Sequence, residues 1–257
     1  MGHIRLGRLP RTQKWREVVD LVEHDGSAAQ VADATVDAAE GEFFSAASDP
    51  VVVHTVWLLT QLPDAARSED FAGALRELGI DVSADPSSTE LAAAVGRAVD
   101  HFAQVGASPR TDIGEMARLA AVEALADLAR DDSPSLFGPV EGDVQAKVGR
   151  IATQKQFGEF ARDFFARMTE RVLTYYVSKE LPRHVGEGHR FQTLDEQRDF
   201  QDAVALHARQ AARIVETFAG GWYSKARFEK DLTPERTGRF VAYAMKKMRR
   251  ELRRGAV

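Results

Sequence analysis

The chain has 257 residues, of which 44% are hydrophobic and 28% are charged. These values are ordinary for a globular protein, so a disordered chain, a collagen-like fibre and a mucin-like stalk are excluded. The absence of cysteine excludes disulfide scaffolds, thiolate zinc sites, iron–sulfur clusters and cysteine nucleophiles, and favours a reducing compartment. Because we find neither a long apolar run nor the apolar segment of a secretory signal, we expect a cytoplasmic protein with no membrane span.

Charge is distributed unevenly along the chain. The formal net charge is −5, but residues 1–16 hold five basic residues and no acid, and residues 239–257 hold seven basic residues against Glu251. The two ends therefore carry +5 and +6, and the segment between them carries −16. An acidic body with two basic ends predicts that the ends bind an anionic partner.

Helical periodicity dominates the first half of the chain, and most segments open with a residue that caps helices well. Asp49 followed by Pro50 has the signature of an N-cap with proline at the first helical position. We interpret the β-branched segment after it as a helix, because the chain offers no second strand for it to pair with. The predicted helices cover about 12–24, 27–47, 50–62, 68–79, 89–105 and 111–130.

Residues 131–135, with the sequence Asp-Asp-Ser-Pro-Ser, are the most linker-like segment of the chain. We place a domain boundary here, between an N-terminal lobe with a basic arm, residues 1–131, and a C-terminal lobe, residues 136–257. The second lobe is predicted to hold helices over about 143–152, 154–181 and 193–219, and a last helix that starts at Thr233.

The predicted helix over 154–181 carries a wide apolar stripe. Six of its residues fall within about 120° of arc at 100° per residue, and they are Phe157, Phe160, Phe164, Met168, Val172 and Tyr175. The helix after it is expected to end at the pair Gly220-Gly221. The sequence therefore predicts an all-α fold, a multi-helix bundle of roughly nine to eleven helices in two lobes.

A polar loop between the two longest predicted helices combines two arginines, two histidines and a carboxylate around two glycines. Its candidate site residues are Arg183, His184, Glu187, His189 and Arg190. Imidazole and carboxylate groups are adequate ligands for a divalent metal, but the spacing matches no rigid metal motif. The arginines and the glycine amides suit an anion equally well. The third interpretation is a polar turn in which glycine relieves backbone strain, and this is the most common role of such a segment.

The segment from Gly220 to Lys230 interleaves aromatic and basic residues. Trp222 and Tyr223 are candidates for stacking on bases, with Lys225 and Arg227 on phosphates. In the structural alternative the glycine pair ends a helix, and Trp222 and Phe228 fill the bundle. A role of Lys225 as a catalytic base lacks a partner group in the sequence.

The last predicted helix has the strongest amphipathic pattern. Val241, Ala244, Met245, Met248 and Leu252 share an arc of about 100°, opposite a row of cations. This face either packs against the acidic body or contacts phosphates or an acidic protein. The candidate binding residues at the two basic ends are Arg5, Arg8, Arg11, Lys14, Lys246, Arg249, Arg250, Arg253 and Arg254.

Phosphate-loop, dinucleotide, nucleophile-elbow and paired-histidine zinc motifs are absent from the sequence, and no cofactor is predicted. Arginine outnumbers lysine 26 to 8, as is typical of GC-rich bacterial genomes. Our leading hypothesis is a non-enzymatic accessory or scaffold subunit of a larger bacterial assembly, in DNA processing or antiviral defence. It would contact nucleic acid or an acidic protein partner through its basic ends. The alternative is an enzyme or a protein that binds a small ligand or anion through residues 183–190 with Tyr223 and Lys225.

Overall fold

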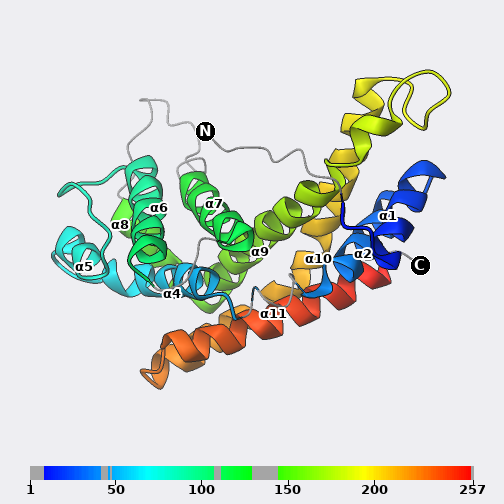
Figure 1. Ribbon diagram of the computed structural model, residues 1–257. Helices are drawn as coiled ribbons and strands as arrows, with labels where there is room; N and C mark the ends of the chain where they lie inside the picture. Colours follow the sequence, from blue (N-terminus) through cyan, green and yellow to red (C-terminus); the bar gives the residue numbers. More distant parts are fainter. Residues whose placement is uncertain (1–8, 42–45, 47, 107–110, 129–143, 256–257) are drawn as a thin grey trace, which may run out of the picture.

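The computed structural model describes residues 9–41, 46, 48–106, 111–128 and 144–255. These residues form ten α-helices and one short 3-10 helix, η1 (Leu181–His184), without a β-strand. The predicted all-α bundle is therefore confirmed. The α-helices (Figure 1) are α1 (Gln13–Glu23), α2 (Ala28–Ala38), α4 (Pro50–Ala65), α5 (Phe71–Glu77), α6 (Ser88–Val105), α7 (Asp112–Asp127), α8 (Val144–Arg150), α9 (Gln154–Val177), α10 (Leu194–Phe228) and α11 (Pro234–Arg254).

Side-chain caps set the first turns of these helices. The Asp49 carboxylate accepts hydrogen bonds from the backbone amides of Val51 at 2.9 Å and Val52 at 3.0 Å. The hydroxyl of Thr233 likewise accepts from the amide of Arg236 at 3.3 Å. Such caps satisfy amides that lack an intrahelical partner. The helix starts predicted at Asp49 and Thr233 are therefore confirmed.

Helix α9 runs through the centre of the bundle and packs against α10, α7 and α2 (Figure 1). Five residues of its predicted stripe are buried, namely Phe157, Phe160, Phe164, Met168 and Val172. The sixth, Tyr175, is half-buried. Within the described residues, no helix combines the length and the apolar character that a bilayer crossing requires.

The predicted end of α10 at Gly220-Gly221 is wrong, because the helix continues to Phe228. Gly220 is buried where α10 meets the first turn of α9. A Cβ atom at this position would lie 2.7 Å from the carbonyl carbon of Gln154 and closer still to its oxygen. Glycine is here a contact residue between two helices and does not end one. Helix α9 also differs from expectation, since it ends at Val177 and η1 follows.

The proposed boundary at 131–135 lies outside the described residues, so the division into lobes 1–131 and 136–257 stays a prediction. Helices from both sides of it contribute to one main hydrophobic core. The indole Nε1 of Trp57 on α4 also donates a hydrogen bond to the carbonyl of Leu232 at 3.0 Å, just before α11. This contact ties together segments 175 residues apart.

His54 on α4 should make the free energy of unfolding depend on pH. Its ring stacks on Phe102 with the ring centroids 3.9 Å apart, and burial lowers its pKa from 6.5 to about 4. Folding therefore favours the neutral ring, so this contribution is complete above pH 6.5 and is lost as the pH falls towards 4. In urea unfolding at several pH values, His54→Phe should lose less stability on acidification than the parent. The control His101→Phe changes an exposed histidine, and an equal pH dependence in all three proteins would contradict the prediction.

Candidate functional site

Helix α11 lies along one edge of the molecule (Figure 1). It packs against α10, α4 and α2. Its buried arc includes all the apolar residues predicted for it and also Phe240. The rest of the helix surface carries the cations. Arg236, in the first turn, pairs with Glu229 and Asp231 at 2.6 Å, and the others divide into two groups with different surroundings.

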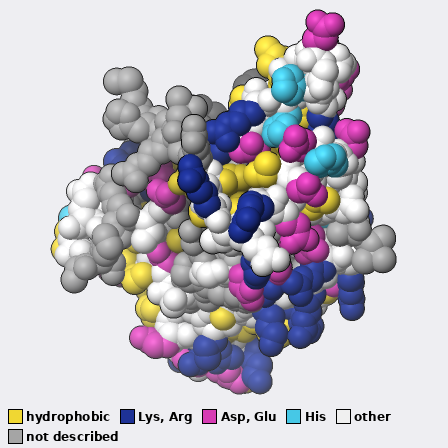
Figure 2. Space-filling model, turned by 45° about the vertical axis from the view of Figure 1, so that its right-hand side comes forward, with side chains coloured by type: hydrophobic (Ala, Val, Ile, Leu, Met, Phe, Trp, Pro, Cys, Tyr) yellow, Lys and Arg dark blue, Asp and Glu magenta, His cyan; other side chains and the backbone are white. Residues whose placement is uncertain are grey.

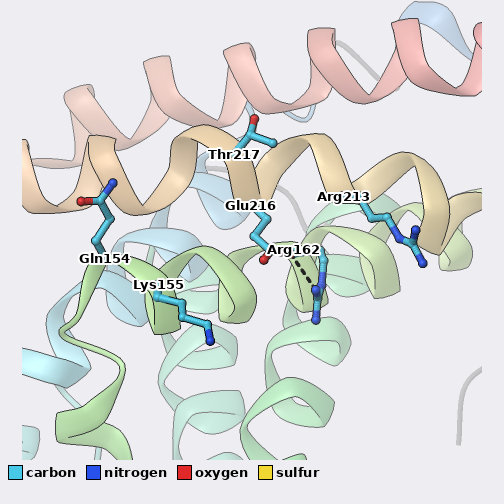
Figure 3. Close-up of a pocket in the computed structure, with 6 residues that line it drawn as sticks. All are labelled: Gln154, Lys155, Arg162, Arg213, Glu216 and Thr217. Carbon is cyan, nitrogen blue, oxygen red and sulfur yellow. Dashed lines mark hydrogen bonds and ion pairs between the residues drawn. The ribbon is translucent and has the colours of Figure 1, made fainter.

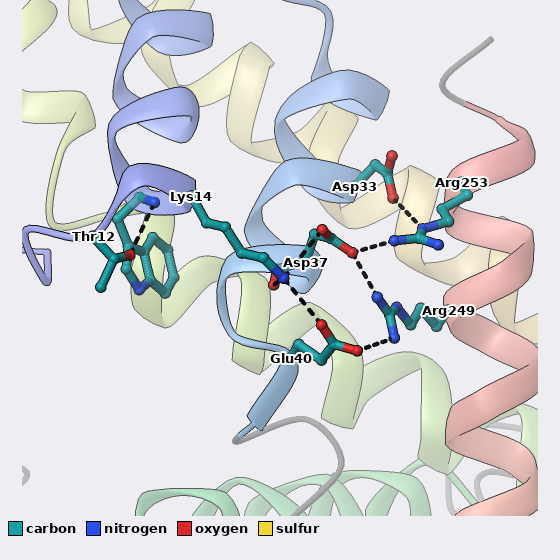
Figure 4. Close-up of polar contacts among 8 residues, drawn as sticks. Thr12, Lys14, Asp33, Asp37, Glu40, Arg249 and Arg253 are labelled. Atoms are coloured by element: carbon teal, nitrogen blue, oxygen red, sulfur yellow. Dashed lines mark hydrogen bonds and ion pairs between the residues drawn. The ribbon is translucent and has the colours of Figure 1, made fainter.

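The first group, Arg249 and Arg253, faces α2 (Figure 4). The guanidinium of Arg249 donates to Asp37 and to Glu40, each at 2.6 Å. Arg253 also hydrogen-bonds Asp37. The ammonium of Lys14 donates to Glu40 at 3.0 Å from the other side. Arg249 and Arg253 therefore dock on the acidic body, as one interpretation of the basic helix had it, and Lys14 of α1 binds the same carboxylates.

The position of Asp37 in this network fixes its charge. Partial burial raises the pKa of its carboxyl group, but hydrogen bonds from Arg249 and Arg253 outweigh burial and leave the pKa below its ordinary value. For Arg249, burial lowers the pKa, but the hydrogen bonds to Asp37 and Glu40 raise it further, above its ordinary value. Both partners are thus charged at neutral pH, and the contact between α2 and α11 is ionic.

Arg249 and its neighbour Arg250 give a matched test of this contact. The Arg249 side chain is 15% exposed in the network, and Arg249→Gln should lower the free energy of unfolding by about 1–2 kcal/mol. Arg250 is exposed, and Arg250→Gln should change it by less than about 0.5 kcal/mol. Urea unfolding at low salt measures both, and equal losses in the two variants would contradict the division of α11 into a docked and a free group.

The second group of cations forms the outer face of α11 together with Tyr243. Its members are Arg239, Lys246, Lys247, Arg250 and Arg254. Arg239, Lys246 and Arg250 fall within about 40° of arc on the side opposite the core. Figure 2 shows Lys and Arg side chains gathered along the lower part of the molecule, where α11 runs in Figure 1. Arg254 pairs with Glu251 at 2.8 Å. Among the described residues no carboxylate lies within 4.0 Å of the other four cations.

An aromatic ring lies within this outer face. Tyr243 is 46% exposed, and its ring and that of Phe218 on α10 form an edge-to-face pair with the centroids 4.8 Å apart. The ammonium of Lys247 lies 5.3 Å from the centre of the Tyr243 ring. From Arg239 to Arg254 the face extends about 22 Å at the rise of an α-helix. It therefore carries four cations without a carboxylate partner among the described residues, one of them over a partly exposed aromatic ring.

The aromatic candidates on α10 lie elsewhere. Tyr223 is completely buried and stacks on Phe157 with the ring centroids 4.0 Å apart. Its ring is therefore not accessible to a base, although the stacking prediction required this. Trp222 is half-buried and stacks on Phe240 at 4.1 Å. Phe228, expected to fill the bundle, is 89% exposed. That expectation is wrong, because Phe228 is the last residue of α10 and points away from the core.

The basic candidates near Tyr223 have nearby carboxylates. Arg227 pairs with Asp64 of α4 at 2.6 Å. Lys225 is 71% exposed and lies 3.9 Å from Glu229.

Of the predicted basic N-terminal residues, Arg11 is exposed, whereas Arg5 and Arg8 lie outside the described residues.

The arginines of the loop 183–190 are engaged in the fold. Arg190 donates hydrogen bonds to the carbonyls of Leu21 at 3.1 Å, Val22 at 3.0 Å and Gly26 at 2.6 Å. It thereby caps the C-terminal end of α1. Arg183 pairs with Glu180 at 2.9 Å. These contacts support a structural role for both arginines rather than anion binding.

The other polar residues of the loop are dispersed. His184 is buried and lies 3.3 Å from Glu180, whereas Glu187 and His189 are exposed. Within the part of the chain that the structure describes, no three metal-binding side chains cluster. Gly186 and Gly188 have φ values of +125° and +78°, which glycine adopts without strain. The turn interpretation accounts for all of these observations.

The alternative site, which joined this loop to Tyr223 and Lys225, does not assemble. The loop precedes the first residue of α10, whereas Tyr223 and Lys225 lie near the other end of this helix of 35 residues. At 1.5 Å per residue, Tyr223 lies about 44 Å from Leu194, the first residue of α10. No substrate of ordinary size contacts both ends.

Comparisons with known protein families, with curated proteins and with solved structures found no match to this chain. Its function is therefore argued from its own surface. The candidate site is the outer face of α11, which includes Arg239, Tyr243 and Lys247, three residues that the sequence did not single out as site residues. Their spacing with Lys246, Arg250 and Arg254 along one helix face is the signal that identifies them.

Proposed function

We propose that this protein is a non-enzymatic accessory subunit that binds nucleic acid through the outer face of α11. The observation that carries the proposal is the row Arg239, Lys246, Lys247 and Arg250, four cations without a carboxylate partner among the described residues, around the exposed ring of Tyr243. Cations of this kind neutralise phosphates, and an exposed aromatic ring accepts a stacked base.

The geometry favours a phosphate backbone over an acidic protein surface. The four unpaired cations lie on one face of one helix, and from Arg239 to Arg250 they span about 16 Å. A nucleic-acid strand supplies phosphates at regular intervals over such a span, whereas an acidic protein must place separate carboxylates to match it. The overall charge of −5 opposes binding elsewhere on the body, so α11 orients the complex.

The setting we propose is a larger bacterial assembly in DNA processing or antiviral defence. The arginine-rich composition supports a bacterial origin, and the absence of cysteine supports the cytoplasm. We expect that a variant with an altered outer face of α11 and an intact fold abolishes the activity of the assembly in cells.

The triple variant Arg239→Gln, Lys246→Gln, Arg250→Gln tests the proposal. It removes three free cations and leaves the buried arc of α11 and the contacts to α2 intact. Binding of a fluorescent 20-mer, measured by anisotropy between about 50 and 200 mM salt, should weaken. The slope of the log–log salt plot should fall by up to about 2 for a single strand and about 3 for a duplex.

The control variant is Arg76→Gln, which removes an exposed cation on α5, away from the outer face of α11. It should bind as the parent does. Unchanged thermal unfolding of the triple variant shows that its fold is intact. The proposal fails if the parent does not bind the 20-mer at about 50 mM salt, where electrostatic contacts are strong, or if the triple variant keeps the parent slope.

A further inference from the structure

A groove of about 820 Å³ lies between α9 and α10 and is lined by six described residues (Figure 3). Along the seam between the two helices the figure shows Gln154, Lys155, Glu216, Arg162 and Arg213 in that order, with Thr217 on the far side of α10. Three of these side chains are cationic and one is a carboxylate. The groove is thus a positively charged depression on a protein whose net charge is negative.

The charges in the groove are only partly neutralised. The Arg162 guanidinium donates to Glu216 at 2.6 Å, and both side chains stay partly exposed, at 41% and 36%. Lys155 lies 3.9 Å from Glu159, beside the groove, and is 80% exposed. Arg213 is exposed and has no carboxylate within 4.0 Å among the described residues. Lys155 and Arg213 therefore have donors free for a ligand.

Helix α10 separates the groove from α11. Helix α10 lies between α9 and α11 in Figure 3, and Thr217 points from α10 towards α11. The next residue, Phe218, contacts the ring of Tyr243. The axes of packed helices are about 8–10 Å apart, and the outer face of α11 points away from the core, so the groove lies more than one helix width from its cations.

We propose that the groove binds a phosphate group, and that the groove and the outer face of α11 bind phosphates of the same nucleic-acid strand. The guanidinium of Arg213 and the ammonium of Lys155 supply charged donors that suit phosphate oxygens. Glu216 holds the Arg162 guanidinium in place, and its own negative charge opposes the ligand. The shared strand rests on the proposed function of α11, whereas phosphate binding in the groove does not.

Two variants that change the charge of the groove in opposite directions test phosphate binding there. The probe is inorganic tripolyphosphate, in calorimetric titrations at low salt. Lys155→Gln with Arg213→Gln should raise the Kd for tripolyphosphate by up to about a hundredfold, because each charged hydrogen bond contributes about a factor of ten. Glu216→Gln should lower the Kd, because it removes the one carboxylate among the described residues that line the groove. The triple variant of α11 should leave the Kd near that of the parent.

The matched controls are Arg76→Gln and Glu77→Gln, two exposed residues of α5 that change the net charge by the same sign and size per site. Neither should alter the Kd for tripolyphosphate. Phosphate binding in the groove is overturned if the parent does not bind the probe, or if the groove variants behave as these controls do.

The shared strand is tested with the fluorescent 20-mer. The groove double variant should lower the salt slope by up to about 1.5 for a single strand, in addition to the effect of the α11 triple variant. An unchanged slope overturns the shared strand while the tripolyphosphate result stands. If the parent binds tripolyphosphate in the groove but binds no 20-mer, the proposed function fails and the groove remains an anion site.

Discussion

The Phe164→Ala variant should lose about 3–5 kcal/mol of its free energy of unfolding. Phe164 is 1% exposed at the centre of α9, and its ring contacts the edge of Phe165 with the centroids 5.1 Å apart. Removal of the ring leaves a cavity that the surrounding helices fill only in part. The loss is a large share of the stability of an ordinary domain, and urea unfolding followed by circular dichroism measures it.

Phe228 provides the matched control, since it is the same residue type at 89% exposure. Phe228→Ala should change the free energy of unfolding by less than about 0.5 kcal/mol. Comparable losses in the two variants would mean that α9 presents a different face to the core.

Substitutions of Gly220 and Gly221 by alanine should have opposite effects. A Cβ atom at Gly220 would overlap the backbone of Gln154, so α9 must move away from α10. The expected loss in the free energy of unfolding is about 1–3 kcal/mol. This value already includes the gain from the higher helix propensity of alanine. At Gly221 the nearest atom is Nε2 of Gln154, at the ordinary contact distance of 3.7 Å. Gly221→Ala should therefore stabilise the protein by up to about 1 kcal/mol.

Thermal and urea unfolding of the two single variants decide the point. Loss of stability in both would mean that the pair tolerates no side chain. A gain in both would mean that α9 and α10 are farther apart at this point than the structure has them. Gln154 also lines the groove between α9 and α10, so a shift of α9 at Gly220 should change the shape of that groove.

The sequence alone determined the features that depend on neighbours along the chain. The cap at Asp49 was predictable because its oxygens bind amides two and three residues away. The buried arc of α11 and the stripe of α9 were predictable because an α-helix repeats every 3.6 residues, so the residues that share a face are fixed by spacing. These local rules were sufficient for the fold class.

Only the tertiary structure decided which cations are free. Arg249 and Arg250 are adjacent in the same amphipathic pattern, yet Arg249 binds Asp37, 212 residues away in the sequence, and Arg250 faces outward. Likewise Tyr223 and Tyr243 both lie among basic residues, and packing buries the first and exposes the second. Gly220 lies within a helix at a point where another helix packs closely against it. In each case the deciding partner lies on a distant segment, and a pattern within one helix carries no information about that partner.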